Sequence, residues 1–138
     1  MSDRRILVVD DEHMIRDMLD KAFTREGYVV TTAESAEAAL EILKETPFRV
    51  MFLDLNLPGM NGVELCRRIR QQRPMAIAYA ITGYARMFEV FDCRDAGFED
   101  YFTKPIDLKT LYAAAHDAFS KLDRWERTVT GAADQKAS

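Results

Sequence analysis

Acidic residues, a hydroxyl and an amine stand directly at or after the short apolar runs of this 138-residue chain. In chain order these residues are Asp10, Asp11, Asp54, Thr82 and Lys104. If the apolar runs are parallel strands of one open sheet, ligands bind beyond the carboxyl ends of those strands. We therefore expect three carboxylates, one hydroxyl and one amine to converge on the same edge of the sheet.

This set of side chains suits phosphoryl transfer. Clustered carboxylates repel one another unless a cation neutralises them, and Mg²⁺ takes oxygen ligands from carboxylates and phosphates. A carboxylate can also be the nucleophile that forms an aspartyl phosphate. Asp54 is the best candidate, because the turn-forming run Asn56-Leu57-Pro58-Gly59 follows it. Lys104 and Thr82 could then stabilise phosphoryl oxygens.

Each of these residues taken singly has an ordinary structural explanation, since an Asp after a strand often caps the next helix. The functional interpretation therefore rests on the combination of all five residues at predicted strand ends and not on any one of them.

Short apolar runs and amphipathic stretches alternate along the whole chain, and these are the elements that must position the polar set. Nearly continuous apolar runs predict strands covered on both faces, at Ile6–Val9, Val50–Leu53 and Ala76–Ile81. Weaker, more polar runs predict strands at or near the sheet edges, at Tyr28–Ala33 and Tyr101–Thr103. Amphipathic stretches predict helices, at Glu12–Glu26, Ser35–Glu45, Gly62–Gln72, Arg86–Ala96 and Leu108 to about Arg127.

Strict alternation predicts an α/β fold, a doubly wound five-stranded parallel sheet with helices on both faces. The flavodoxin-like order 2-1-3-4-5 suits five strands, although alternation alone does not establish it. Gly27 and Gly97 stand where helices should end, and Ser35 and Asn61 are good N-cap residues. We expect one domain over residues 1–127 and a disordered tail over 128–138, with no further domain after it.

Composition excludes several classes of protein. Hydrophobic residues make up 48% and charged residues 30%, which is typical of a soluble globular domain and too apolar for disorder. The net charge of -4 argues against direct nucleic-acid binding. Cys66 and Cys93 lack metal-binding or redox spacing, so reduced thiols and a cytoplasmic location are expected. No signal peptide is visible, and no apolar run approaches the roughly 18 residues that cross a membrane.

Four segments resemble the response-regulator receiver family, over roughly Arg5 to Leu122. They are Val8–Glu12, Leu53–Gly62, Ile81–Gly83 and Asp100–Pro105. The resemblance implies that Asp54 accepts a phosphoryl group from a phosphohistidine on a sensor histidine kinase or histidine phosphotransfer protein. It further implies that Asp11, Asp54 and the Asn56 carbonyl bind Mg²⁺, with Asp10 assisting through water.

The same resemblance implies a signalling role rather than an enzyme that turns over a substrate, although the domain assists its own phosphorylation and dephosphorylation. Thr82 and Lys104 would contact the phosphoryl group, Tyr101 would act as an aromatic switch, and the Lys104–Pro105 bond would be cis. The surface around the fourth helix, fifth strand and fifth helix would then change and address a downstream target or output domain.

This sequence departs from the family at one position, and two further positions are variable in that family. Leu57 stands where many members carry Met, a conservative difference that should leave the chemistry intact. Asn56 and Tyr84 occupy the positions that tune the lifetime of the phosphoryl group.

Other residues carry weaker signals. His13 and His116 lack a second ligand at metal spacing, so helix-surface roles are expected for both. Phe88 and Phe91 share one face of the fourth predicted helix, where they either pack in the core or form an exposed patch for a partner or a homodimer.

Competing functions remain at this point. A haloacid-dehalogenase-type phosphatase also uses an aspartyl nucleophile and Mg²⁺, but its DxD motif follows the first strand and it needs a cap domain. A dinucleotide-binding domain needs a glycine-rich loop where this chain is acidic. A phosphorylation-independent interaction module of the same fold would be expected to lose acidic residues, and none is missing here.

Overall fold

The computed structural model describes residues 4–83 and 87–137, with side chains over 4–83 and 90–128. Its strands are β1 (Arg5–Val9), β2 (Val29–Ala33), β3 (Val50–Asp54), β4 (Ile77–Thr82) and β5 (Asp100–Thr103). All neighbouring strands pair in parallel, in the order β2-β1-β3-β4-β5. The predicted fold class and strand order are therefore confirmed.

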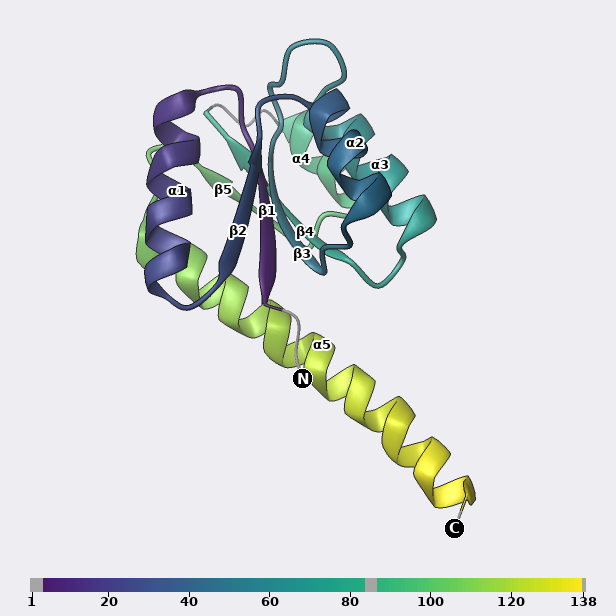
Figure 1. Ribbon diagram of the computed structural model, residues 1–138. Coiled ribbons are helices and arrows are strands. Elements are labelled where there is room, and N and C mark those ends of the chain that lie inside the picture. The colour runs from purple at the N-terminus through teal and green to yellow at the C-terminus, as the bar shows by residue number, and fades with distance from the viewer. Residues whose placement is uncertain (1–3, 84–86, 138) are drawn as a thin grey trace.

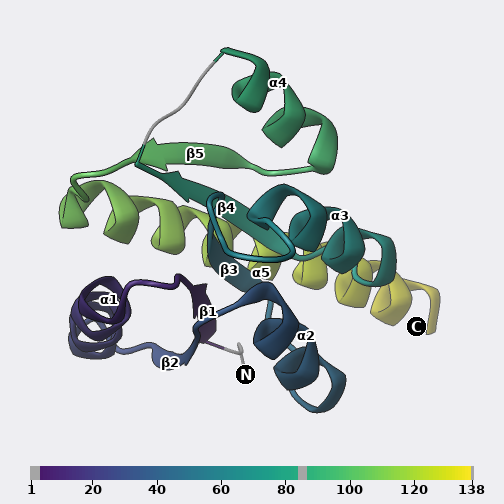
Figure 2. The ribbon, with the colours of Figure 1, turned by 90° about the horizontal axis from the view of Figure 1, so that it is seen from above.

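Helices cover both faces of this sheet, as predicted. They are α1 (His13–Arg25), α2 (Ala36–Glu45), α3 (Gly62–Gln72), α4 (Met87–Ala96) and α5 (Leu108–Ala137). Figures 1 and 2 show α1 and α5 on one face and α2, α3 and α4 on the other. This double covering explains why the central strands are apolar on both sides.

Alternate side chains of one strand supply the two halves of the core. Ile6 and Val8 of β1 pack toward Phe119 and the other apolar residues of α1 and α5. Leu7 and Val9 pack toward the cluster formed with α2, α3 and α4. Because successive side chains of a strand point to opposite faces, an unbroken apolar run is what a strand between two helical layers requires.

The polar strands lie at the edges, as predicted. Every residue of β3 is buried, whereas β2 and β5 consist largely of exposed or half-buried residues. An edge strand has one neighbour only and is less completely covered, which permits its polar composition.

The predicted helix boundaries are supported by local hydrogen bonds. The Ser35 side chain accepts a hydrogen bond from the Ala38 amide at 3.0 Å, and Asn61 accepts one from the Glu64 amide at 2.9 Å. Gly27 and Gly97 adopt φ of 94° and 101°, where a side chain would be strained.

The fifth helix was predicted to end at about Arg127, whereas α5 continues to Ala137. Continuing an existing helix needs no new nucleus, and this segment contains several Ala residues and no Pro. The lack of an apolar face therefore did not end the helix. Figure 1 shows the C-terminal part of α5 running past the end of the sheet.

Two further expectations concern the cysteines and membrane spans. Cys66 and Cys93 are both buried, and burial raises the pKa of the Cys66 thiol to about 12. Among the residues that the structure describes, no helix combines the length and apolar character needed to span a bilayer.

Candidate functional site

The carboxyl ends of β1, β3, β4 and β5 bring four of the predicted residues to one edge of the sheet. Asp54 and Thr82 are the last residues of their strands, while Asp10 and Lys104 directly follow theirs. Asp10, Asp54 and Thr82 are buried, with 1%, 3% and 0% of their surfaces exposed. Buried polar groups are rare unless they are paired, so this edge is chemically unusual.

The backbone holds Asp54 in place through the start of α3. The Gly62 amide donates a hydrogen bond to the Leu55 carbonyl at 3.2 Å. A side chain at Gly62 would collide with the Asp54 carbonyl oxygen, so only glycine permits this close approach. Leu55 and Leu57 are buried and anchor the connecting loop.

Each buried carboxylate has one oxygen held by a backbone amide. Asp10 Oδ1 accepts a hydrogen bond from the Glu12 amide at 2.8 Å, and Asp54 Oδ1 accepts one from the Asn56 amide at 3.1 Å. The second oxygen of each carboxylate faces Lys104, which gives both side chains a defined orientation.

Lys104 is surrounded by three carboxylates. Its Nζ lies 2.8 Å from Glu12 Oε1, 3.2 Å from Asp10 Oδ2 and 3.8 Å from Asp54 Oδ2. Burial alone would lower the pKa of Lys104, but the contacts with Glu12, Asp54 and Asp10 outweigh it and raise the pKa above its ordinary value. The ammonium therefore stays charged.

Burial works in the opposite direction on the carboxylates. Burial is the main cause that raises the pKa of Asp54 to about 6, and the negative charges of Asp10 and Asp11 raise it further. The hydrogen bond from the Asn56 amide and the positive charge of Lys104 lower this pKa, but they do not outweigh burial. The pKa of Asp10 is also raised, chiefly by burial. The site carries more negative charge than Lys104 can neutralise.

The donor set fits a hard divalent cation such as Mg²⁺. Carboxylate oxygens of Asp10, Asp11 and Glu12 lie within 4.8 Å of one another. Asp10 Oδ2 is a buried oxygen that accepts no hydrogen bond among the described residues, because its 3.2 Å contact with Lys104 Nζ lacks hydrogen-bond geometry. A buried oxygen that has an ion-pair contact but no hydrogen bond, beside exposed carboxylates, is what an oxygen-coordinated cation would satisfy.

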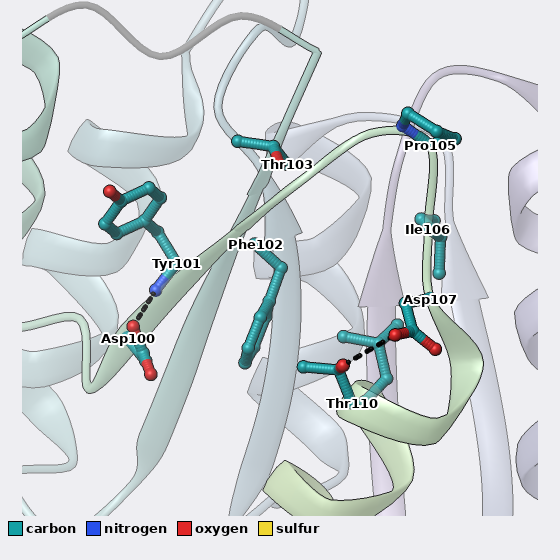
Figure 3. Close-up of a pocket in the computed structure, with 9 residues that line it drawn as sticks. Asp100, Tyr101, Phe102, Thr103, Pro105, Ile106, Asp107 and Thr110 are labelled. Atoms are coloured by element: carbon teal, nitrogen blue, oxygen red, sulfur yellow. Dashed lines mark hydrogen bonds between the residues drawn. The ribbon is translucent and has the colours of Figure 1, made fainter.

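The two predicted switch residues occupy different environments. Thr82 is fully buried, and its Oγ1 accepts a hydrogen bond from Asn56 Nδ2 at 3.4 Å. Tyr101 on β5 is 39% exposed. Figure 3 shows Tyr101 and Phe102 on opposite sides of β5, with Phe102 on the side of Thr110. The Lys104–Pro105 bond is cis, as expected.

The remaining candidates are placed as follows. Phe91 is 62% exposed on α4, so the core-packing alternative does not hold for it. Tyr84 and the side chain of Phe88 lie outside the described residues. His13 and His116 are exposed on α1 and α5, in agreement with their expected surface positions.

Glu12 is the residue that the sequence interpretation missed. It was expected as the start of the first helix and lay in the segment Val8–Glu12 that carries the family resemblance, but no site role was predicted for it. Its side chain makes the shortest contact to Lys104. Its position directly after two site aspartates was the available signal. Nothing local to Glu12 could indicate a partner 92 residues away.

Asp54→Asn should stabilise the metal-free protein at pH 7.5. Its pKa in the folded state, about 6, exceeds its ordinary value of 3.8, so folding favours the protonated form. The cost of the buried charge is present above pH 6 and absent below about pH 4. A pKa difference of about two corresponds to about 3 kcal/mol, and this net shift already includes the attraction to Lys104, so the expected gain in unfolding free energy is about 3 kcal/mol.

Urea unfolding in a chelating buffer, carried out at pH 7.5 and at pH 4, measures this gain in unfolding free energy. The difference between Asp54→Asn and the parent should nearly vanish at pH 4. A variant less stable than the parent at pH 7.5 would contradict the assigned cause.

Comparisons with known proteins cover most of the chain. A family model described as response regulator receiver domain matches residues 6–116. The chain is 35% identical over 109 residues to the transcriptional regulatory protein TcrA of Mycobacterium tuberculosis, covering 79% of this chain and 43% of TcrA. It is 37% identical over 124 residues to the virulence sensor protein BvgS of Bordetella bronchiseptica, covering 85% of this chain and 10% of BvgS.

Solved structures agree with these matches. A CheY-like receiver domain protein from Methanospirillum hungatei superimposes with a TM-score of 0.86 at 29% identity, over 89% of this chain and 98% of that one. A BeF3-activated DrrB receiver domain superimposes with a TM-score of 0.80 at 29% identity, over 86% of this chain and 99% of the DrrB chain. The chain thus spans less than half the length of TcrA and nearly all of these single-domain structures.

Proposed function

The chain belongs to the response regulator receiver domain family of two-component systems, and from that premise we propose that it accepts a phosphoryl group on Asp54. The observation that carries the proposal is the buried Asp54 carboxylate, with one oxygen held by the Asn56 amide and the other 3.8 Å from Lys104. A nucleophile held beside a fixed cation is what phosphoryl transfer requires, since its catalysis is mainly positioning and charge stabilisation.

The transfer can be written with this chain's own groups. One Asp54 carboxylate oxygen forms a bond to phosphorus. The bond from phosphorus to the donor's imidazole nitrogen breaks, and that nitrogen keeps the electron pair and takes up a proton. Lys104 would neutralise charge on the phosphoryl oxygens, and the hydroxyl of Thr82, which is buried at the end of β4, would donate to one of them.

Mg²⁺ would be held by Asp11, Asp54 and the Asn56 carbonyl, with Asp10 assisting through water. When bound, it would supply positive charge to the phosphoryl oxygens and offset the repulsion between carboxylates. The absence of a hydrogen bond to the buried Asp10 Oδ2 and the proximity of the Asp11 carboxylate support this assignment.

A phosphoryl group would also give Thr82 a new acceptor and draw its hydroxyl away from Asn56. We expect the half-exposed Tyr101 ring to turn inward in response and alter the surface of α4, β5 and α5. Saturation with beryllofluoride, a phosphoryl mimic, should shift the amide NMR signals of Tyr101 and α4. Unchanged signals there, with shifts confined to the surroundings of Asp54, would contradict the switch.

The proposed partners follow from the family and its relatives. A sensor histidine kinase or a histidine phosphotransfer protein would supply the phosphoryl group, and one relative, BvgS, is itself a sensor protein. The exposed Phe91 supports a role for the α4 face in binding a downstream target or a second copy of this chain. Direct nucleic-acid binding is not expected of this domain, and a cytoplasmic location remains a prediction.

Mass spectrometry after incubation with acetyl phosphate tests the proposal. The chain should gain one phosphoryl group when Mg²⁺ is present and none when a chelator removes it. An unmodified chain under both conditions would favour the phosphorylation-independent interaction module. The family match leaves no support for the haloacid-dehalogenase alternative.

A further inference from the structure

Lys104 is hydrogen-bonded to a carboxylate outside the expected set of site residues. Its Nζ donates to Glu12 Oε1 at 2.8 Å, whereas the contact with Asp10 lacks hydrogen-bond geometry. The 3.8 Å separation from Asp54 Oδ2 is beyond hydrogen-bond range. In this structure the ammonium is therefore held by Glu12 rather than by Asp54.

Glu12 differs from the two buried carboxylates in its exposure. Its side chain is 58% exposed, whereas those of Asp10 and Asp54 are 1% and 3% exposed. Its backbone is fixed, because its amide donates to Asp10 and its carbonyl accepts from the Arg16 amide at 3.1 Å. The Glu12 side chain can thus leave Lys104 for solvent without any change in the fold.

We propose that Glu12 is the resting counter-ion of Lys104 and competes with the phosphoryl group on Asp54 for that ammonium, an inference that rests on the proposed function. An exposed carboxylate is a weak partner for a lysine, and a phosphoryl group held beside the lysine is a stronger one. Lys104 therefore exchanges Glu12 for the phosphoryl group. Glu12 is a positioning residue, since it acts on the phosphoryl group only through Lys104.

The alternative role for Glu12 is that of a metal ligand, because its carboxylate lies within 4.8 Å of those of Asp10 and Asp11. The two roles predict opposite effects. Removing a metal ligand should weaken the binding of both Mg²⁺ and a phosphoryl mimic. Removing a competing counter-ion should strengthen binding of the mimic and leave Mg²⁺ binding nearly unchanged.

Glu12→Gln separates these roles. In the presence of saturating Mg²⁺, titration with beryllofluoride followed by amide NMR should show binding about two- to fivefold tighter than in the parent, the range expected for an exposed ion pair. Glu34→Gln is the matched control, because Glu34 is an exposed carboxylate directly after β2 at the same edge of the sheet. It removes the same charge and should change the affinity much less.

A second measurement follows Glu12 itself. In the parent, saturation with beryllofluoride should shift the carboxylate ¹³C signal of Glu12 toward the position that it has in metal-free Lys104→Met, where its partner is absent. Binding by Glu12→Gln that is no tighter, equal tightening by Glu34→Gln, or an unmoved Glu12 signal would each overturn the inference. A parent that binds no beryllofluoride would instead contradict the proposed function.

Discussion

Asp54→Asn should lose all labelling by acetyl phosphate, while the parent gains one phosphoryl group. The amide keeps the size of the side chain but is not a nucleophile comparable to a carboxylate. Loss of labelling cannot then be attributed to unfolding, because the same substitution removes a buried charge and should stabilise the fold at pH 7.5. Intact-mass spectrometry measures the labelling, and peptide mapping locates it.

Asp95→Asn is the matched control for this experiment. Asp95 is exposed near the end of α4, and that end lies away from the carboxyl ends of the strands. The control should be labelled like the parent. A phosphoryl group found on His13 or His116 would contradict the assignment and point to a histidine relay instead.

Asp11→Ala should weaken Mg²⁺ binding by about tenfold or more, since loss of groups that only support metal ligands already costs that much. Asp11 is exposed, so its removal should leave the fold intact. Amide shifts during Mg²⁺ titration, without a phosphodonor, give the affinity. The affinity of the parent for Mg²⁺ should also decrease when the pH is lowered to less than about 6, because a protonated Asp54 is a poor metal ligand.

Glu34→Gln again serves as the control, because it removes one negative charge, as Asp11→Ala does. The affinity of this control for Mg²⁺ should stay within about twofold of the parent, as expected for a screened surface charge. If Asp11→Ala binds Mg²⁺ as tightly as the parent, Asp11 is not a ligand. The exposed Glu12 would then be the next candidate, and the counter-ion inference would have to be reconsidered with it.

Features that depend on neighbours in the chain could be predicted from the sequence. The apolar run of β3 predicted a strand buried on both faces, and the cap residues Ser35 and Asn61 marked helix starts, because both signals act over a few residues. The alternation of elements implied a parallel sheet, and a parallel sheet gathers its carboxyl ends. Placement of Asp54, Thr82 and Lys104 at one edge followed.

Features that depend on distant pairing could not be predicted in this way. The exposure of Phe91 is one case, because an apolar residue on a helix is buried or exposed according to what packs against it. The end of α5 was missed for a local reason instead, since no residue at Arg127 stops the helix and α5 continues to Ala137.

The sequence by itself determined that Asp54, Thr82 and Lys104 stand at the carboxyl ends of strands, and the tertiary structure alone decided which atoms face one another there. Glu12 and Lys104 are brought together by β1 and β5, which are separated in the sheet by β3 and β4. The pKa of Asp54 likewise depends on burial beneath surrounding elements and on the charges of Asp10 and Asp11. Local patterns specify strands and their ends, but contact distances and desolvation arise only when the whole sheet and its helices have assembled.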